Sequence, residues 1–236
     1  MTGATTRPEP TRAERWVFVS PHADDAIWSV GGIIACCSAM RETTLVTIFA
    51  PPPDCRATRE AEDRAAAGVL GCRLVSLGLP EARSRRNETG NLYRSSLALR
   101  RKPLANDPAA AAVGSAVAEV FPGASAIFVP LATHSHVDHV IVRDAVLACA
   151  EPSIAIMAYP EFPYHRHKTE SLSQNPALPC DPVAWLAAAT LYSTEAIAMF
   201  GTRERFEHAL RDFISERTCD RSGNCAQSII PLRPAL

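Results

Sequence analysis

The sequence predicts an α/β fold in which a mostly parallel sheet carries helices on both faces. Short runs rich in β-branched and aromatic residues alternate with longer helical stretches along the 236 residues. The spacing between successive strands leaves room for the helical crossover that parallel strands require. No apolar run reaches the ~18 residues of a transmembrane helix. We therefore expect the apolar residues, 47% of the chain, to form a buried core.

Five runs are predicted to be strands. Trp16–Ser20 is bounded by a charged segment and Pro21, and Thr43–Ala50 is rich in β-branched residues. Pro51–Pro53 ends the second strand, because successive prolines donate no ladder hydrogen bonds. The other three strands are Arg73–Leu77, Ala126–Leu131 and Ile154–Tyr159.

Six longer stretches are predicted to be helices, and Gly71 is a suitable stop for the second of them. They are Ala26–Met40, Ala57–Leu70, Pro108–Val120, Asp138–Ala150, Val183–Tyr192 and Arg203–Arg217. Two irregular stretches remain. Leu79–Asn106 is arginine-rich and is expected to be a long surface excursion, and Phe162–Pro182 has no clear period. We expect substrate choice to depend on these two stretches.

Length and charge narrow the class of protein. At about 150 residues per domain, we expect one α/β domain at 15–217, a flexible tail at 1–14 and a C-terminal tail at 218–236. Lys and Arg number 24 and Asp and Glu 25, and this balance argues against nucleic-acid binding. Residues 1–14 lack the apolar region of a signal peptide. We therefore expect a cytoplasmic protein without a membrane partner.

The eight cysteines form no CxxC pair, and without an export signal they are expected to be reduced. Cys219 and Cys225 lie in the polar segment TCDRSGNC, where they could close a small loop or bind a metal. A solvated tail is the favoured interpretation.

Two clusters of histidine and aspartate each follow a predicted strand. The first is PHADD at residues 21–25, and the second is HSHVDH at residues 134–139. Because the carboxyl ends of parallel strands open at the same edge of a sheet, the two clusters are expected to converge in space. Two imidazoles and a carboxylate there would suit a divalent metal.

Structural interpretations must be weighed against this one. Asp is a favoured helix N-cap, so the first cluster could simply cap the next helix. A lone histidine is more often structural than a ligand. However, adjacent carboxylates at Asp24 and Asp25 repel each other, and a cation on one would leave the other free as a base. Two clusters at one edge favour the metal site.

Three interpretations of that site compete. HxHxDH at 134–139 matches the metallo-β-lactamase signature, with His134 as a ligand of a binuclear hydrolase, but it leaves the first cluster unused. His165, His167 and His208 lie downstream without an obvious strand-end setting. The second interpretation is a facial triad for Fe(II) formed by His22, Asp24 and His139. However, the oxygenases that use such a triad are built mainly of antiparallel strands, which this sequence does not predict.

The third interpretation uses both clusters. VSPHADDAIWSVGG resembles the (A/S)HPDDE signature of the PIG-L/LmbE-like deacetylases, and THSHVDHVIVRDAV resembles that family's HPDHxxxxxA motif. Further matches lie in the family's order: Arg59-x-x-Glu62 with Ala65-Ala66 and Leu70-Gly71, the turn Leu79-Pro80-Glu81, and the late strand YPEFPY at 159–164. The resemblance covers about residues 16 to 200.

This resemblance implies a Rossmann-like, LmbE-like fold and a zinc-dependent hydrolase that removes acyl groups, usually acetyl, from amino sugars and related amides. It implies that one Zn²⁺ per chain is bound by His22, Asp25 and His139, with Fe²⁺ as the alternative ion. Asp24 would be the general base. His136 would be a second acid/base group or would stabilise the oxyanion, and Asp138 would orient His136 and help keep it protonated. Either Asp24 or His136 would protonate the leaving amine.

Three further residues are candidates for substrate binding. Arg59 would contact substrate hydroxyls or a phosphate, although a surface arginine paired with Glu62 or Asp63 has equal weight. Glu81 and His134 would line the same pocket. The departures from the family pattern are Ala23, Ala26, Val137, the prolines at 51–53, and His134 where some relatives have Tyr. They remove no ligand or base, so they bear on the substrate rather than on the reaction.

The function expected is N-deacetylation of an amino sugar or glycosylated small molecule, such as an N-acetylglucosamine derivative. Natural-product tailoring or low-molecular-weight thiol metabolism would suit the family. An S-conjugate amidase, another amide hydrolase, the binuclear hydrolase and a non-enzymatic Rossmann-like binding module remain alternatives. A homo-oligomer is compatible with the sequence.

Overall fold

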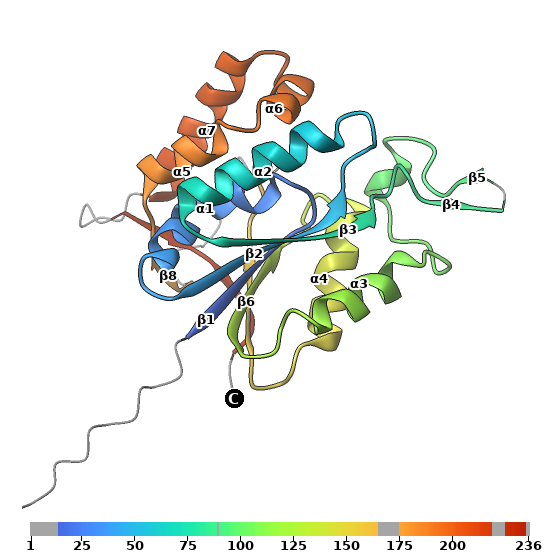
Figure 1. Cartoon of the computed structure of the whole chain (residues 1–236), viewed down its shortest axis with the longest axis horizontal. Helices are drawn as coiled ribbons and strands as arrows, with labels where there is room; N and C mark the ends of the chain where they lie inside the picture. The colour runs from blue at the N-terminus through green and yellow to red at the C-terminus, as the bar shows by residue number, and fades with distance from the viewer. Residues whose placement is uncertain (1–13, 89, 165–174, 219–224, 235–236) are drawn as a thin grey trace, which may run out of the picture.

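The computed structural model of the chain describes residues 14–88, 90–164, 175–218 and 225–234. A six-stranded sheet lies between two layers of helices (Figure 1), in the order β10-β7-β6-β1-β2-β3. Within this sheet β1, β2, β3, β6 and β7 are parallel, and only β10 is antiparallel to its neighbour. Their bounds are β1 Arg15–Ser20, β2 Glu42–Ala50, β3 Arg73–Pro80, β6 Ala124–Pro130, β7 Ala155–Tyr159 and β10 Ile230–Arg233. The predicted α/β fold is confirmed.

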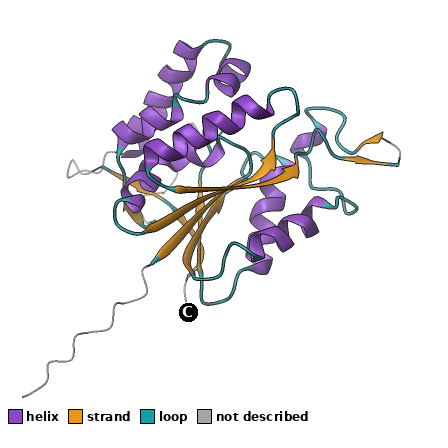
Figure 2. Ribbon diagram, in the orientation of Figure 1, coloured by secondary structure: helices purple, strands orange, loops and turns teal. Residues whose placement is uncertain are grey.

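The helices cover both faces of this sheet (Figure 2). On one face lie α1 Asp25–Ser38, α2 Arg56–Leu70, α5 Pro182–Ala189 and α7 Arg203–Thr218, and on the other lie α3 Ala109–Ala118 and α4 Val137–Cys149. The alternation of side chains along β1 builds both cores. Phe18 packs into the first core, whereas Val17 and Val19 pack into the second.

Two glycines allow α1 to approach α5 closely. A Cβ on Gly31 would lie 2.6 Å from Cδ1 of Trp185, and a Cβ on Gly32 would collide with Sγ of Cys180. Val30, just before them, has non-helical φ and ψ values of −142° and 22°, so α1 is kinked there. Both glycines are therefore needed for helix packing, beside the turn that carries the first cluster.

Most described residues of the stretch Leu79–Asn106 are exposed, as the sequence predicts, but the stretch also contains short elements and a small buried core. The strand β3 continues to Pro80, and the short elements β4 Arg86–Asn87, β5 Gly90–Asn91 and η1 Ala98–Arg100 follow. Tyr93 and Leu99 are buried with Ala82 and Val137 in a small third core. The elements here are too short to produce a readable period, and the arginine content conceals a buried arginine, Arg85.

The C-terminal part also differs from the prediction. The helix predicted at Val183–Tyr192 ends at Ala189, and a further helix, α6 Ser193–Phe200, follows. The short strands β8 Ala177–Pro179 and β9 Ala226–Ser228 pair with each other, and β10 lies where a tail was expected. Pro231 is tolerated in β10 because this strand forms the edge of the sheet. Cys219, His165 and His167 lie outside the described residues.

Among the described residues, no single helix is long and apolar enough to cross a membrane. Pro182–Ala189 and Ser193–Phe200 pass a length and composition test only as a pair bent by 83°.

Candidate active site

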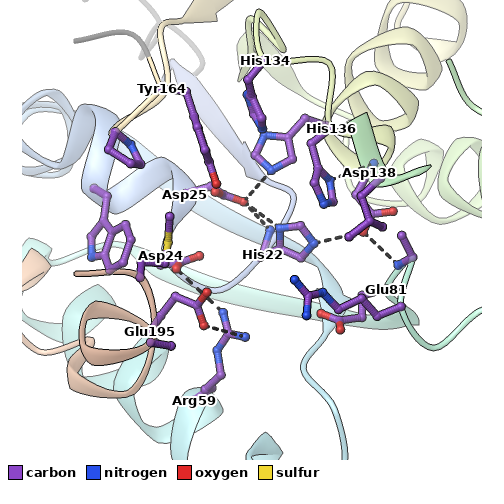
Figure 3. Close-up of a pocket in the computed structure, with 18 of the residues that line it drawn as sticks. His22, Asp24, Asp25, Arg59, Glu81, His134, His136, Asp138, Tyr164 and Glu195 are labelled. Atoms are coloured by element: carbon purple, nitrogen blue, oxygen red, sulfur yellow. Dashed lines mark hydrogen bonds and ion pairs between the residues drawn. The ribbon is translucent and has the colours of Figure 1, made fainter. Parts of the chain in front are cut away.

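The two predicted clusters meet at the carboxyl ends of the neighbouring strands β1 and β6. The turn after β1 carries His22, Asp24 and Asp25, and the start of α4 carries Asp138 and His139. Figure 3 shows the side chains of the first cluster and of Asp138 converging on one pocket, which His139 also lines. The convergence predicted from the strand-end positions is therefore confirmed.

The capping interpretation of the first cluster is wrong. Asp24 occupies the N-cap position of α1, but its side chain makes no capping hydrogen bond. The hydroxyl of Ser20 accepts a hydrogen bond from the N–H of Ala26 at 3.0 Å, and the carboxylate of Asp25 accepts one from the N–H of His22 at 2.9 Å. Because other groups satisfy these N–H donors, the Asp24 carboxylate is left to face the pocket.

His22, Asp25 and His139 form a compact group of potential metal ligands. Oδ2 of Asp25 lies 3.0 Å from Nδ1 of His22 and 3.3 Å from Nε2 of His139. The three ligand atoms lie within 4.8 Å of one another. Although burial opposes ionisation, His139 and His22 hold the pKa of Asp25 well below its usual range. Two imidazoles and one ionised carboxylate are a donor set that fits zinc or iron(II).

Asp24 lies beside this group and is buried. An arginine of α2, Arg59, places Nη2 3.8 Å from Oδ2 of Asp24 and Nη1 3.3 Å from Oε2 of Glu195. Burial, followed by repulsion from Asp25, raises the pKa of Asp24 well above its ordinary value, and Arg59 offsets part of that rise. The ion-pair distances therefore favour Asp24 and Glu195 as the partners of Arg59, and not Glu62 or Asp63.

Glu195 is a pocket residue that sequence reasoning missed. It lies in the first turn of α6, a helix of eight residues that was not predicted. The run Ser193-Thr194-Glu195 contains the Ser/Thr and acidic residues typical of a helix start, and this signal could have revealed it.

The carboxylate of Asp138 is used differently from the prediction. Its Oδ2 lies 3.0 Å from Nε2 of His22 and accepts a hydrogen bond from the N–H of Ala82 at 2.9 Å. Its Oδ1 lies 2.6 Å from Nη1 of Arg85, which also pairs with Asp107 at 3.1 Å. The carboxylate therefore orients His22. No sequence signal separated Arg85 from the arginines around it.

His136 is linked to Asp138 through the backbone instead. Its Nδ1 accepts a hydrogen bond from the N–H of Asp138 at 3.3 Å, which makes His136 the N-cap of α4. Burial, together with His22 and His139, lowers the pKa of His136 to about 3. A neutral ring that accepts at Nδ1 carries its proton on Nε2. The structure thus differs from the expectation that Asp138 keeps His136 protonated.

His134 lies against the aromatic ring of Tyr164. The two rings are stacked, with centroids 3.8 Å apart and an interplanar angle of 10°. Burial is the main reason why the pKa of His134 falls to about 3. Neither ring nitrogen of His134 has a hydrogen-bond partner among the described residues. Nδ1 of His134 lies 3.5 Å from Oε1 of Glu161.

The pocket has a volume of about 530 Å³. All nine predicted site residues line it, together with an apolar wall and two further arginines. The predicted residues are His22, Asp24, Asp25, Arg59, Glu81, His134, His136, Asp138 and His139. Glu81 is buried, and Arg83 and Arg100 contribute positive charge to the lining.

Residues 17–150 match the family model PIG-L, described as GlcNAc-PI de-N-acetylase. A 2'-N-acetylparomamine deacetylase from Streptomyces fradiae is 33% identical over 169 residues, which cover 66% of this chain and 60% of the relative. The chain thus aligns with less than two thirds of that relative's length.

Two solved structures share the fold at low identity. A zinc-inhibited form of a teicoplanin deacetylase matches with a TM-score of 0.75 and 19% identity over 92% of this chain and 97% of the other. A 4-carboxy-2-hydroxymuconate hydratase from Pseudomonas putida matches with a TM-score of 0.62 and 13% identity over 94% of this chain and 98% of the other. Because one fold supports two reactions, the reaction must be argued from the site.

Proposed function

Because this chain belongs to the PIG-L family, we propose that it is a metal-dependent N-deacetylase that hydrolyses the N-acetyl group of an amino sugar or glycosylated small molecule. The observation that carries the proposal is the buried carboxylate of Asp24 next to the group formed by His22, Asp25 and His139. Amide hydrolysis needs a proton acceptor beside an activated water, and this arrangement provides for both.

The metal would be held by Nδ1 of His22, a carboxylate oxygen of Asp25 and Nε2 of His139. These atoms are the ones that face one another, at 3.0 and 3.3 Å from Asp25. A divalent ion bound there supplies Lewis-acid activation of water and of the amide carbonyl. We propose Zn²⁺, one ion per chain, with Fe²⁺ as the alternative.

Asp24 acts as the general base. It is adjacent in sequence to a ligand but is not needed in the ligand group, so its oxygens remain available to take a proton from the attacking water. Arg59, 3.8 Å away, holds the carboxylate toward the pocket without a close bond that would block it. After attack, the proton on Asp24 can pass to the leaving amine.

His136 lines the same pocket as Asp24 and serves as the stabiliser of the developing oxyanion. The bond from the Asp138 N–H to Nδ1 leaves the proton on Nε2, so the ring can donate one hydrogen bond from that atom. A donor aimed at the charge that develops in the transition state is worth about 3 kcal/mol. This role does not need a charged imidazole.

The remaining pocket residues are suited to a sugar-sized amide. Arg59, Glu81 and Glu195 offer charged groups for hydroxyl or amino substituents, and Tyr164 with His134 offers a flat aromatic surface. The 33%-identical relative named 2'-N-acetylparomamine deacetylase supports an N-acetylated aminoglycoside precursor as the substrate class. We accordingly propose a role in antibiotic or related natural-product biosynthesis.

Metal analysis combined with a deacetylation screen tests this function. Purified protein should contain one zinc-type ion per chain and should release free amine from N-acetylated amino sugars, with 2'-N-acetylparomamine and N-acetylglucosamine as first substrates. Active protein that is free of divalent metal would exclude the proposed chemistry. Metal-loaded protein that leaves a broad panel of N-acetyl sugars intact would favour a non-enzymatic binding module.

A further inference from the structure

Glu161 is a buried carboxylate that the proposed reaction does not use. It follows β7, and its side chain is 0% exposed. A carboxylate in such a place is costly unless hydrogen bonds satisfy it. Its partners therefore indicate why the chain keeps a charge there.

One partner is the metal-ligand candidate His139. Oε1 of Glu161 lies 3.0 Å from Nδ1 of His139, on the side of the ring opposite to Nε2. A carboxylate only accepts, so Nδ1 must carry the proton, and the lone pair is then fixed on Nε2. Nε2 is the atom that faces Asp25, at 3.3 Å. The bond to Glu161 thus selects the tautomer that can bind a metal.

The second partner is the loop that follows β6. The N–H of Ala132 lies 3.0 Å from each of the two carboxylate oxygens of Glu161. Ala132 has a φ of 59°, which lies in the left-handed region and is unfavourable for alanine. Glu161 therefore holds this loop, which leads to His134 and His136, in a conformation that it would not favour alone.

The backbone next to Glu161 is tied to the other ligand segment. The N–H of Phe162 donates to the hydroxyl of Ser29 at 3.2 Å, and that hydroxyl donates to the carbonyl of Asp25 at 2.5 Å. Glu161 is thus fixed to the segment of α1 that carries Asp25 while its side chain fixes His139. The spacing between these two ligands depends on this connection.

A different use of the same residues must be considered. His134, His139 and Glu161 also form a group whose ligand atoms lie within 4.8 Å of one another, as a second cation site would require. For His139 to bind one ion through Nε2 and another through Nδ1, its ring would have to lose its last N–H proton. In addition, both oxygens of Glu161 already accept from Ala132. These facts disfavour a second ion.

We propose that Glu161 is a positioning residue of the metal centre, which fixes the tautomer and orientation of His139 and holds the loop at Ala132. This inference rests on the proposed metal site. Removing such a carboxylate partner typically costs 10–100-fold in metal affinity. The glutamate should therefore affect metal binding before any substrate is present.

The test measures zinc affinity by competition with a chromophoric chelator in the full-length protein. Glu161→Ala should bind zinc up to about 100-fold more weakly, and Glu161→Gln, which keeps an oxygen acceptor, about 10-fold more weakly. Asp63→Asn is the matched control. Asp63, like Glu161, is a buried carboxylate with hydrogen-bond partners, which are two hydroxyl groups in its case, but it lies outside the ligand group. Its zinc affinity should equal that of the wild type.

Histidine ¹⁵N NMR provides a readout independent of affinity and activity. In the wild type, the Nδ1 proton of His139 should be protected from exchange. In Glu161→Gln this proton should still be observed, but its resonance should shift. In Glu161→Ala the signal of this proton should be lost. If the alanine variant does not fold, the glutamine variant with unchanged affinity and an unchanged resonance is sufficient to reject the proposal.

The remaining outcomes separate this inference from the proposed function. A wild type that binds two zinc ions, one of which is lost in both Glu161→Ala and His134→Ala, would overturn positioning in favour of a second metal site. A wild type that binds one ion, with equal affinity in all Glu161 variants, would reject only the role of Glu161. A wild type that binds no divalent ion would reject the proposed function itself.

Discussion

The Oδ2 atom of Asp138 lies 3.0 Å from Nε2 of His22, although 116 residues separate them in the sequence. The same carboxylate is held from behind by Arg85 at 2.6 Å. His22 therefore presents Nδ1 to Asp25 because Asp138 occupies its other nitrogen. Burial disfavours the charged ring, yet the bonds to Asp138 and Asp25 raise the pKa of His22.

Asp138→Asn should weaken both the metal site and the fold. An amide cannot neutralise Arg85, and it has one oxygen where the carboxylate uses Oδ2 for His22 and Ala82 and Oδ1 for Arg85. Zinc affinity should fall 10–100-fold, and the metal-free protein should lose about 3 kcal/mol of unfolding free energy because a buried ion pair is broken. Chelator competition and urea unfolding measure the two effects.

Asp144→Asn is the control for this variant. Asp144 lies on the same helix, α4, but its side chain is 57% exposed and pairs with Arg143 at the surface. An exposed pair contributes under about 1 kcal/mol, so both affinity and stability should stay close to the wild-type values. If the two variants behave alike, the link between Asp138 and His22 has no energetic importance.

Asp24→Asn should separate catalysis from metal binding. The amide keeps the size of the carboxylate but cannot accept a proton, so kcat should fall 10²–10⁴-fold. Zinc content should stay at the wild-type value, because Asp24 is not in the ligand group. Full activity in this variant would show that another group is the base, and loss of zinc would show that Asp24 is a ligand.

His139 in α4 and His136 at its N-cap should respond differently to alanine substitution. His139→Ala removes a ligand atom and should abolish both metal binding and activity. His136→Ala removes a donor in the pocket wall and should keep the metal while kcat falls 10²–10³-fold. His208→Ala on α7, which is 82% exposed, should change neither measurement. Equal metal loss in the first two variants would contradict the separate roles of these residues.

The sequence predicted the parts of the molecule that follow from local pattern. Strand-end positions were enough to bring His22 and His139 together, because parallel topology brings the carboxyl ends of strands to one edge. The use of Asp138 was not predictable, because its partner Arg85 lies in a segment without a period. Glu195 was missed because one helix ending at Tyr192 was predicted where the structure has two, of which the second begins at Ser193. The strand β10 was missed because it contains Pro231. A proline is unfavourable in a central strand, but it is tolerated in an edge strand, and the sequence alone does not show that this segment forms an edge.

Gly32→Ala should destabilise the fold, and Gly68→Ala should not. A Cβ on Gly32 would meet Sγ of Cys180 and lie 3.0 Å from the carbonyl oxygen of Asp181, so α1 and α5 would have to separate. Such overpacking costs about 1–3 kcal/mol. Gly68 lies inside α2 with open space around it, and alanine there should add about 1 kcal/mol. Urea unfolding of the two variants measures both changes in stability. If both variants are destabilised, the steric contact at Gly32 is not the cause of the destabilisation.

Asp63 should make the stability of the wild type depend on pH. It is a buried residue of α2, and it accepts hydrogen bonds from the hydroxyls of Thr47 at 2.7 Å and Tyr192 at 2.6 Å. Burial raises its pKa above the ordinary value of 3.8, although these bonds and the charges of Arg59 and Arg64 partly oppose the rise. Cys72 is a further titratable group that faces it. The folded protein thus binds the Asp63 proton more tightly than the unfolded chain does.

The sign of the effect follows from this difference in proton affinity. The stabilisation that comes from protonated Asp63 is complete below pH 3.8, the ordinary pKa, and is lost as the pH rises through the raised pKa of the folded state. Asp63→Asn cannot ionise, so the free energy of unfolding of the wild type should fall relative to this variant over that range. The other charged groups are the same in both proteins and cancel in the difference. Urea unfolding in steps from pH 3 to pH 8 measures it, and a difference that stays constant would mean that Asp63 ionises in the folded protein as easily as in the unfolded chain.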